Sequence, residues 1–232
     1  VPFKMRGEMM EDKDVRNPFV ARIMLENEKS KAKLYYKENP GSLIPLFEKE
    51  LKDLGFEFET SSQTFGFVPK YKNVIVPIAL KYYQLAKETN MSNEQNHFIG
   101  FFRIKGLDEI VPLLLSDFYS DKTTDLTRWL ISDCIYQIKS RQFIKEYLNI
   151  ASNRAFGINR QMIILLLGKL KDESAVPTLI ALLDDEEVRL QAICALSEFK
   201  RKDFRCYFER FQSSTNAGWR KYSKKAIQKL DS

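Results

Sequence analysis

The chain has 232 residues, 44% of them hydrophobic, so it can bury a substantial core as one extended or two compact domains without a metal or a disulfide. Its three cysteines, Cys134, Cys194 and Cys206, show no CxxC spacing and no histidine partner, which argues against a disulfide framework and a zinc site. The net charge of +6 is uneven: positions 197–232 hold ten Lys/Arg and four Asp/Glu, whereas positions 1–196 hold 27 of each, so any preference for an anionic partner belongs to the C-terminal end.

The sequence contains no segment typical of a membrane protein. The longest apolar run, Met162 to Leu167, is far shorter than the roughly 18 residues that span a bilayer. The start, VPFKMRGEMMEDKD, lacks the apolar core of a signal peptide. Together with the unpaired cysteines, these features predict a protein of the reducing cytoplasm that does not associate with membranes.

The segment 1–72 predicts a helical cap followed by an aromatic-rich connector. Apolar residues recur at helical spacing from Asp14 to Lys37, and the turn Asn39–Ser42 places Ser42 to cap a second helix beginning at Leu43. The segment GFEFETSSQTFGFVPKYK then carries aromatic residues on both sides of a polar centre. This pattern fits either a short β-hairpin or a tucked loop.

A short phrase ending in proline recurs along the chain. It reads LIP at Pro45, IVP at Pro77, IVP at Pro112 and AVP at Pro177, and the last interval is about twice as long as the two before it, as if one phrase were missing. Proline is tolerated in the first turn of a helix, so each phrase marks a helix start. A unit of this length fits a pair of helices that buries its apolar faces only by stacking on neighbours. We expect the second helices of the pairs to begin near Pro45, Pro77, Pro112, Ile144, Pro177 and Phe204.

The segment GINRQMIILLLGKLKDESAVPTLIALLDDEEVRLQAICALSEF resembles HEAT repeats. The family pattern of an early proline, an aspartate at the turn and a Val-Arg pair that opens the next unit is matched by Pro177, Asp184, Val188 and Arg189. The resemblance covers Asp108 to Leu230 and extends to bacterial HEAT-repeat proteins whose function is not established. It implies binding rather than a reaction, and an all-α fold: an α-α superhelix of about five helix pairs over residues 73–232, packed with the N-terminal cap as one continuous solenoid.

Catalytic motifs are missing from the sequence. The nine glycines form neither GxxxxGK nor GxGxxG, and no GxSxG or HExxH occurs. The one histidine, His97, has no cysteine, second histidine or carboxylate cluster at ligand spacing, which favours a structural role. The sequence therefore predicts a protein that is not an enzyme and uses no cofactor or metal.

Trp129 and Asp133 are the one pair that suggests chemistry. HEAT-like DNA glycosylases that excise alkylated bases use an aromatic residue and an aspartate in a concave cleft, and a spacing of four places both residues on one helix face. The repeat register assigns the segment TDLTRWLISDCIYQI, which contains both residues, to the first helix of a pair. We expect first helices on the convex side of the solenoid. The pair is therefore interpreted as a packed tryptophan beside a solvated or capping aspartate.

Two surfaces are candidates for binding. The first is a concave row on the second helices, at non-core positions one, four and five residues after each proline, and it fits a protein partner. Its members are Lys49, Lys81, Tyr82, Asp117, Lys145, Asn149, Thr178 and Ala181. The second is a basic C-terminal end that either solvates a terminal repeat or binds an anion such as nucleic acid. Its members are Lys200, Arg201, Lys202, Arg220, Lys221, Lys224 and Lys225.

The sequence therefore predicts a protein-interaction or scaffold module, whose partner, pathway and oligomeric state it does not specify. The alternative is a nucleic-acid-binding HEAT-like protein, including a relative of the alkylation-repair glycosylases. A continuous basic track along the concave groove, joined to the C-terminal end, would favour the alternative.

Overall fold

A computed structural model describes residues 18–231, and within this range every regular element is a helix. The segment 1–14, on which the prediction of no signal peptide rests, lies outside it. No helix in the described range is both long enough and apolar enough to cross a membrane. The α-helices are α1 Pro18–Glu38, α2 Ile44–Asp53, α3 Ser61–Thr64, α4 Val68–Glu88, α5 Ser92–Ile99, α6 Val111–Tyr119, α7 Asp125–Ile138, α8 Ile144–Ser152, α9 Gln161–Leu170, α10 Val176–Ala181, α11 Arg189–Glu198, α12 Arg205–Glu209 and α13 Ala217–Asp231.

The helices form two compact units, with the boundary inside α4 between Tyr82 and Tyr83. We call the described residues up to Tyr82 the N-terminal unit and those from Tyr83 onward the C-terminal unit. The packing of both units into one continuous solenoid stays a prediction from the sequence.

The N-terminal unit is centred on α2 and the first part of α4. α2 buries Ile44, Phe47 and Leu51, and the Phe47 ring meets the edge of the Tyr82 ring with 5.8 Å between centroids. The hydroxyl of Tyr82 donates to the carboxylate of Glu50 over 3.0 Å, so the polar end of this tyrosine is also satisfied.

The aromatic-rich connector is helical rather than a hairpin. It contains α3 and a 3₁₀ turn, Phe65–Phe67. The side-chain oxygen of Gln63 accepts hydrogen bonds from the backbone N–H groups of Glu59 (2.7 Å) and Thr60 (3.4 Å), which satisfies two amides at the helix start. Of the two alternatives that the sequence left open, the β-hairpin is therefore excluded, and the segment is a loop that contains short helical turns.

Five of the six expected helix starts are confirmed, since α2, α6, α8, α10 and α12 begin at or next to the predicted positions. The exception is α4, which begins at Val68, so that Pro77 lies in its interior beyond a backbone break at Tyr71. Proline removes one helical hydrogen bond, but the preceding Ile75 and Val76 are buried and hold the segment in place.

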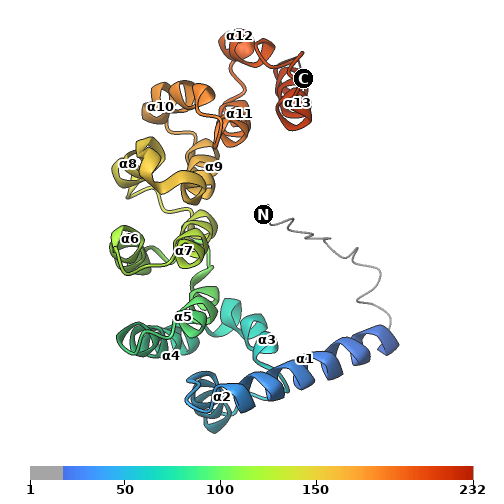
Figure 1. The fold of residues 1–232 in the computed structure, drawn as a ribbon, viewed down its shortest axis with the longest axis vertical. Helices are drawn as coiled ribbons and strands as arrows, with labels where there is room; N and C mark the ends of the chain where they lie inside the picture. Colours follow the sequence, from blue (N-terminus) through green and yellow to red (C-terminus); the bar gives the residue numbers. More distant parts are fainter. Residues whose placement is uncertain (1–17, 232) are drawn as a thin grey trace. The chain divides into compact units, whose positions relative to one another are not determined.

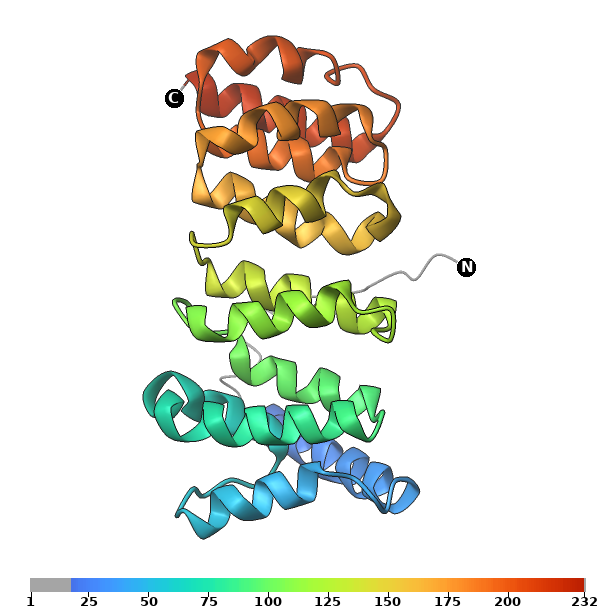
Figure 2. The same ribbon diagram turned by 90° about the vertical axis from the view of Figure 1, so that its left-hand side faces the viewer.

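The C-terminal unit is a two-layered stack of helices (Figures 1 and 2). α6, α8, α10 and α12 form one layer and α5, α7, α9, α11 and α13 form the other. Consecutive helices of the second layer are in extensive contact, whereas those of the first layer scarcely touch one another. A stack curves toward its more closely spaced layer, and Figure 1 shows α7, α9, α11 and α13 on the inside of the curve. The proline-bearing helices therefore lie on the outside, which corrects the expectation that they form the concave row.

The inner-layer helices share one register. One residue at an equivalent position marks each helix: Gln95, Arg128, Arg160, Arg189 and Arg220. In all five helices, the residues three, six and seven places after the marked residue are buried. These buried residues are Phe98, Phe101 and Phe102; Ile131, Cys134 and Ile135; Ile163, Leu166 and Leu167; Ala192, Ala195 and Leu196; and Ser223, Ala226 and Ile227. This spacing places one continuous stripe of each helix between the two layers.

Two of these helices approach each other at their backbones. A Cβ added at Gly168 of α9 would overlap the Cα and Cβ of Ala195 in α11, so only glycine fits there. This contact sets the narrow spacing of the inner layer at its centre.

Candidate functional site

The side of the inner layer that faces away from the core forms a surface we call the inner face. It consists of the exposed and half-buried residues one, two, five and nine places after each marked arginine of α7, α9, α11 and α13. They are Trp129, Leu130, Gln137, Gln161, Met162, Leu165, Lys169, Leu190, Gln191, Cys194, Glu198, Lys221, Tyr222, Lys225 and Lys229.

The middle of the inner face is apolar. Trp129, Leu130, Met162 and Leu165 are half-buried, and Tyr222 at the C-terminal end is 39% exposed. Tryptophan, tyrosine and methionine are enriched in protein interfaces, and lysine and glutamate are depleted from interface cores. The middle of the inner face, on α7 and α9, therefore has the composition of a protein-binding surface.

A row of ion pairs crosses one edge of the inner face. The Glu198 carboxylate of α11 lies 3.2 Å from the ammonium of Lys169 in α9 and 3.2 Å from that of Lys229 in α13. Burial raises the pKa of Glu198, but the hydrogen bonds from these lysines outweigh it and keep the pKa below its ordinary value. Burial raises the pKa of the neighbouring Cys194 thiol to about 11, so this thiol stays protonated and unreactive.

The marked arginines hold the turns together. Arg128 donates to the carbonyls of Phe118 and Ser120, and Arg189 donates to that of Leu183, each at the end of the preceding outer-layer helix. Carbonyls at a helix end have no partner inside the helix, so the guanidinium groups satisfy them. Arg220 donates to the carbonyl of Ser214 in the connection between α12 and α13.

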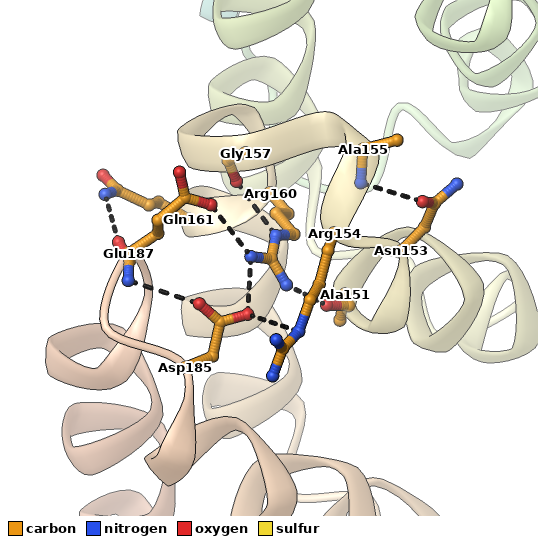
Figure 3. A network of polar contacts seen from close by, with 9 residues as sticks. All are labelled: Ala151, Asn153, Arg154, Ala155, Gly157, Arg160, Gln161, Asp185 and Glu187. Carbon is orange, nitrogen blue, oxygen red and sulfur yellow. Dashed lines mark hydrogen bonds and ion pairs between the residues drawn. The ribbon is translucent and has the colours of Figure 1, made fainter.

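Arg160 is the most buried of these arginines, and its network is drawn in Figure 3. Its guanidinium lies 2.8 Å from Asp185 and donates to the carbonyls of Ala151 (3.1 Å) and Gly157 (2.9 Å). Burial raises the pKa of Asp185, but the hydrogen bond and charge of Arg160 outweigh it and hold the pKa below the ordinary value. Arg160 thus joins one turn of the stack to the next.

A family model described as HEAT repeats matches residues 144–213, which run from the first residue of α8 through α12. This segment consists of HEAT repeats. No curated protein matches the chain.

The row predicted from the sequence does not form one exposed surface. In the HEAT repeats, Lys145, Asn149 and Ala181 are exposed and Thr178 is half-buried, all on the outer-layer helices α8 and α10. Asp117 of α6 is fully buried and binds the Tyr83 hydroxyl and the Lys87 ammonium. It is therefore part of the fold.

The three remaining members of that row lie in the N-terminal unit. Lys49 is exposed and pairs with Asp53 over 2.6 Å, and Lys81 pairs with Glu50. Tyr82 is buried. Lys49 and Lys81 thus stay exposed but are paired with carboxylates of α2, whereas Tyr82 is part of the core.

The basic C-terminal end divides into paired and unpaired cations. Arg201 binds Glu173 (2.7 Å) and Asp203 (2.6 Å), and Arg220 binds backbone carbonyls. The other five members make no ion pair with any described residue. Of these, Lys221, Lys224 and Lys225 lie together on the exposed side of α13, and Lys200 and Lys202 lie in the connection before α12.

Trp129 and Asp133 differ from each other in exposure. Trp129 is half-buried on the inner face, so the expectation that this pair lies on the convex side is wrong. Asp133 is 6% exposed, and its carboxylate lies 2.5 Å from the guanidinium of Arg103. This ion pair occupies the carboxylate that a glycosylase would need for its substrate.

Nothing in the described range resembles a metal centre: no group of three or more His, Cys, Asp or Glu side chains there is arranged to hold an ion. The one histidine packs among aromatic rings, with centroids 5.3 Å from Phe98 and 5.6 Å from Phe101. Burial lowers the pKa of His97 to about 4, so the ring is neutral at physiological pH.

His97 is expected to make the fold sensitive to mild acid. Its pKa is lower in the folded chain than the value of roughly 6.5 in the unfolded chain, so the unfolded chain binds the extra proton between pH 6.5 and 4. The free energy of unfolding should therefore be insensitive to this group above pH 6.5 and fall by about 2–3 kcal/mol as the pH drops toward 4.5. Urea unfolding at several pH values measures this. His97→Gln should remove this contribution and leave only the part of the decrease that comes from carboxylates such as Asp185 and Glu198. An equal decrease in the variant and the wild type would contradict the assignment.

Proposed function

We propose that the C-terminal unit is a non-enzymatic protein-interaction module and that its partner binds the inner face. The observation that carries this proposal is that α7 and α9, which lie on the inside of the curve, carry the half-buried apolar side chains Trp129, Leu130, Met162 and Leu165. Partly exposed apolar and aromatic side chains of this kind often form the energetically important centre of protein interfaces. The unpaired cysteines support a cytoplasmic location as part of the same proposal.

Nucleic-acid binding is less well supported by the charges on this face. Of the inner-face residues on α7, α9 and α11, Lys169 is the one cation, and it is paired with Glu198. A phosphate backbone needs several cations in succession, because its affinity comes from neutralising consecutive phosphates. The basic end therefore has no continuation along the inner face.

The proposal is tested by comparing matched variants in affinity capture. The tagged chain and the variants Met162→Asp/Leu165→Asp (inner face) and Lys145→Asp/Asn149→Asp (outer layer) are incubated with nuclease-treated and untreated lysate of the source organism. We expect the wild type to capture a protein that nuclease treatment does not release. The outer-layer variant should capture the same protein, and the inner-face variant should not. Loss with the outer-layer variant instead would place the partner on α8. Release by nuclease would favour the alternative function.

The basic end gives a separate expectation for DNA. If the five unpaired lysines bound phosphates as a track, the affinity for duplex DNA would fall with salt by a logarithmic slope of about 0.9 per phosphate contact. We expect weak binding at all ionic strengths instead, because the patch is confined to α13 and the connection before α12. Fluorescence anisotropy measures this. Sub-micromolar DNA binding at physiological salt would favour the nucleic-acid alternative over the protein-interaction function, provided that the triple variant Lys221→Glu/Lys224→Glu/Lys225→Glu abolishes it.

The glycosylase alternative predicts release of alkylated bases from DNA. We expect no release by the wild type, and therefore no change in Trp129→Ala or Asp133→Ala, because Arg103 already binds the Asp133 carboxylate. Chromatography of free bases from methylated DNA provides the measurement. Release by the wild type that disappears in both variants would restore this alternative.

A further inference from the structure

Gln95 stands where the following four inner-layer helices have arginine. It lies four residues after Met91, the residue that precedes α5, just as Arg128 lies four residues after Thr124, the residue that precedes α7. The residues buried after it follow the same three, six and seven spacing. Gln95 is itself buried and donates to the Tyr83 hydroxyl over 3.2 Å.

In the next three helices the arginine fills the space between successive turns. The guanidinium of Arg128 lies 5.8 Å from the centre of the Phe156 ring in the next turn. Arg160 reaches Asp185 over 2.8 Å, and Arg189 lies 4.2 Å from the centre of the Trp219 ring. The glutamine side chain is shorter than that of arginine, and Gln95 is directed to Tyr83 of α4.

A cavity of about 200 Å³ occupies that position. It is far larger than the roughly 30 Å³ that one water molecule takes up in the liquid. All its lining residues are polar and come from the α4–α5 and α6–α7 turns: Lys87, Asn90, Ser92, Gln95, Ser120, Lys122, Thr123, Thr124 and Thr127. The first residue of α5 and the residue preceding α7 are among them, so the positive ends of two helix dipoles border the cavity.

The charged residues that line the cavity favour an anion as its ligand. It includes two lysines and no carboxylate. Lys87 is paired with the buried Asp117, which also accepts the Tyr83 hydroxyl, whereas Lys122 makes no ion pair with any described residue. The Thr123 hydroxyl donates to the Asp117 carbonyl, and the hydroxyls of Thr124 and Thr127 bind each other. The hydroxyls of Ser92 and Ser120, together with one hydrogen of the threonine pair, can therefore donate to a ligand.

We propose that this cavity binds a phosphate-type oxyanion, held by the Lys122 ammonium, by the hydroxyls of the two turns and by the start of α7. A cation is disfavoured because the lining carries the Lys122 ammonium and no carboxylate, while the charge of Lys87 is balanced by Asp117. The cavity lies at the turn edge of the C-terminal unit and uses none of the inner-face residues, so this site is independent of the proposed protein partner.

The test is a titration of the full chain with inorganic phosphate at constant ionic strength, followed by the backbone amide NMR shifts of Ser92, Thr123, Thr124 and Thr127. We expect saturable shifts at these residues. Lys122→Glu should weaken the apparent affinity by about tenfold or more, because a charge-assisted hydrogen bond is lost. The control Lys105→Glu reverses an exposed lysine in the α5–α6 connection, at the other ends of these helices, and should bind phosphate as the wild type does.

Two further ligands define the anion. Acetate should bind more weakly than phosphate. If the natural ligand is a phosphate group on a larger molecule, phosphoserine should bind at least as well as inorganic phosphate. If the natural ligand is free phosphate, phosphoserine should bind more weakly. Shifts that do not saturate, shifts that are unchanged in Lys122→Glu, or acetate binding as tightly as phosphate would each overturn the proposal. If Lys122→Glu without ligand has a lower thermal unfolding midpoint than the wild type, Lys122→Ala, which introduces no new charge, is used in its place.

Discussion

Replacing Arg160 by methionine is expected to lower the free energy of unfolding by about 3–5 kcal/mol, the range for breaking a buried ion pair by removing one partner. Methionine fills much of the same volume but leaves the Asp185 carboxylate, 6% exposed, without its closest cation. It also leaves the carbonyl of Ala151 without a donor. Urea denaturation followed by circular dichroism measures the change.

The matched control is Arg210→Met, which removes an ion pair with Asp184 in which both side chains are well exposed to solvent. An exposed pair contributes about 0–1 kcal/mol, so this variant should unfold close to the wild type. Asp185→Leu added to Arg160→Met should recover part of the loss, because no unpaired buried charge then remains. Equal effects of Arg160→Met and Arg210→Met would show that the network does not stabilise the fold.

Leu179→Ala or Leu196→Ala is expected to destabilise the C-terminal unit by about 2–5 kcal/mol. Both side chains are fully buried, Leu179 in α10 and Leu196 in α11, so truncation leaves a cavity between the layers. Leu126→Ala makes the same chemical change at a side chain that is 59% exposed, and should stay within about 0.5 kcal/mol of the wild type. Denaturation midpoints in urea compare the three, and unchanged midpoints for both buried sites would contradict the assigned core.

The sequence predicted the helix pairs because their starts carry a local signal. A proline such as Pro112 or Pro177 is compatible with the first turn and little else in a helix, so it locates a boundary without knowledge of the fold. Pro77 breaks this rule, since the helix around it extends upstream to Val68. The connector was ambiguous because two local patterns compete there: the spacing of its aromatic residues suggests a hairpin, whereas Thr60 and Gln63 form the capping box of a short helix.

The candidate site was less predictable, because it depends on which layer lies inside the curve. That choice follows from helix spacing, and the spacing depends on contacts such as Gly168 against Ala195, which no local pattern marks. A usable signal was present in the arginines of the inner layer, which recur at similar but unequal intervals at Arg128, Arg160, Arg189 and Arg220. Their drift in spacing, and the glutamine at position 95, conceal the repeat from a search for a fixed period.

The contact between Gly168 and Ala195 also has a mechanical consequence. In a bent beam, the layer that is already in backbone contact resists further compression, and the opposite layer takes up most of the strain. Here α9 and α11 form the incompressible layer, while α8, α10 and α12 are loosely spaced and can separate or approach. The C-terminal unit should therefore change its curvature mainly by spreading or closing its outer helices, with the inner face keeping its side-chain arrangement as it bends.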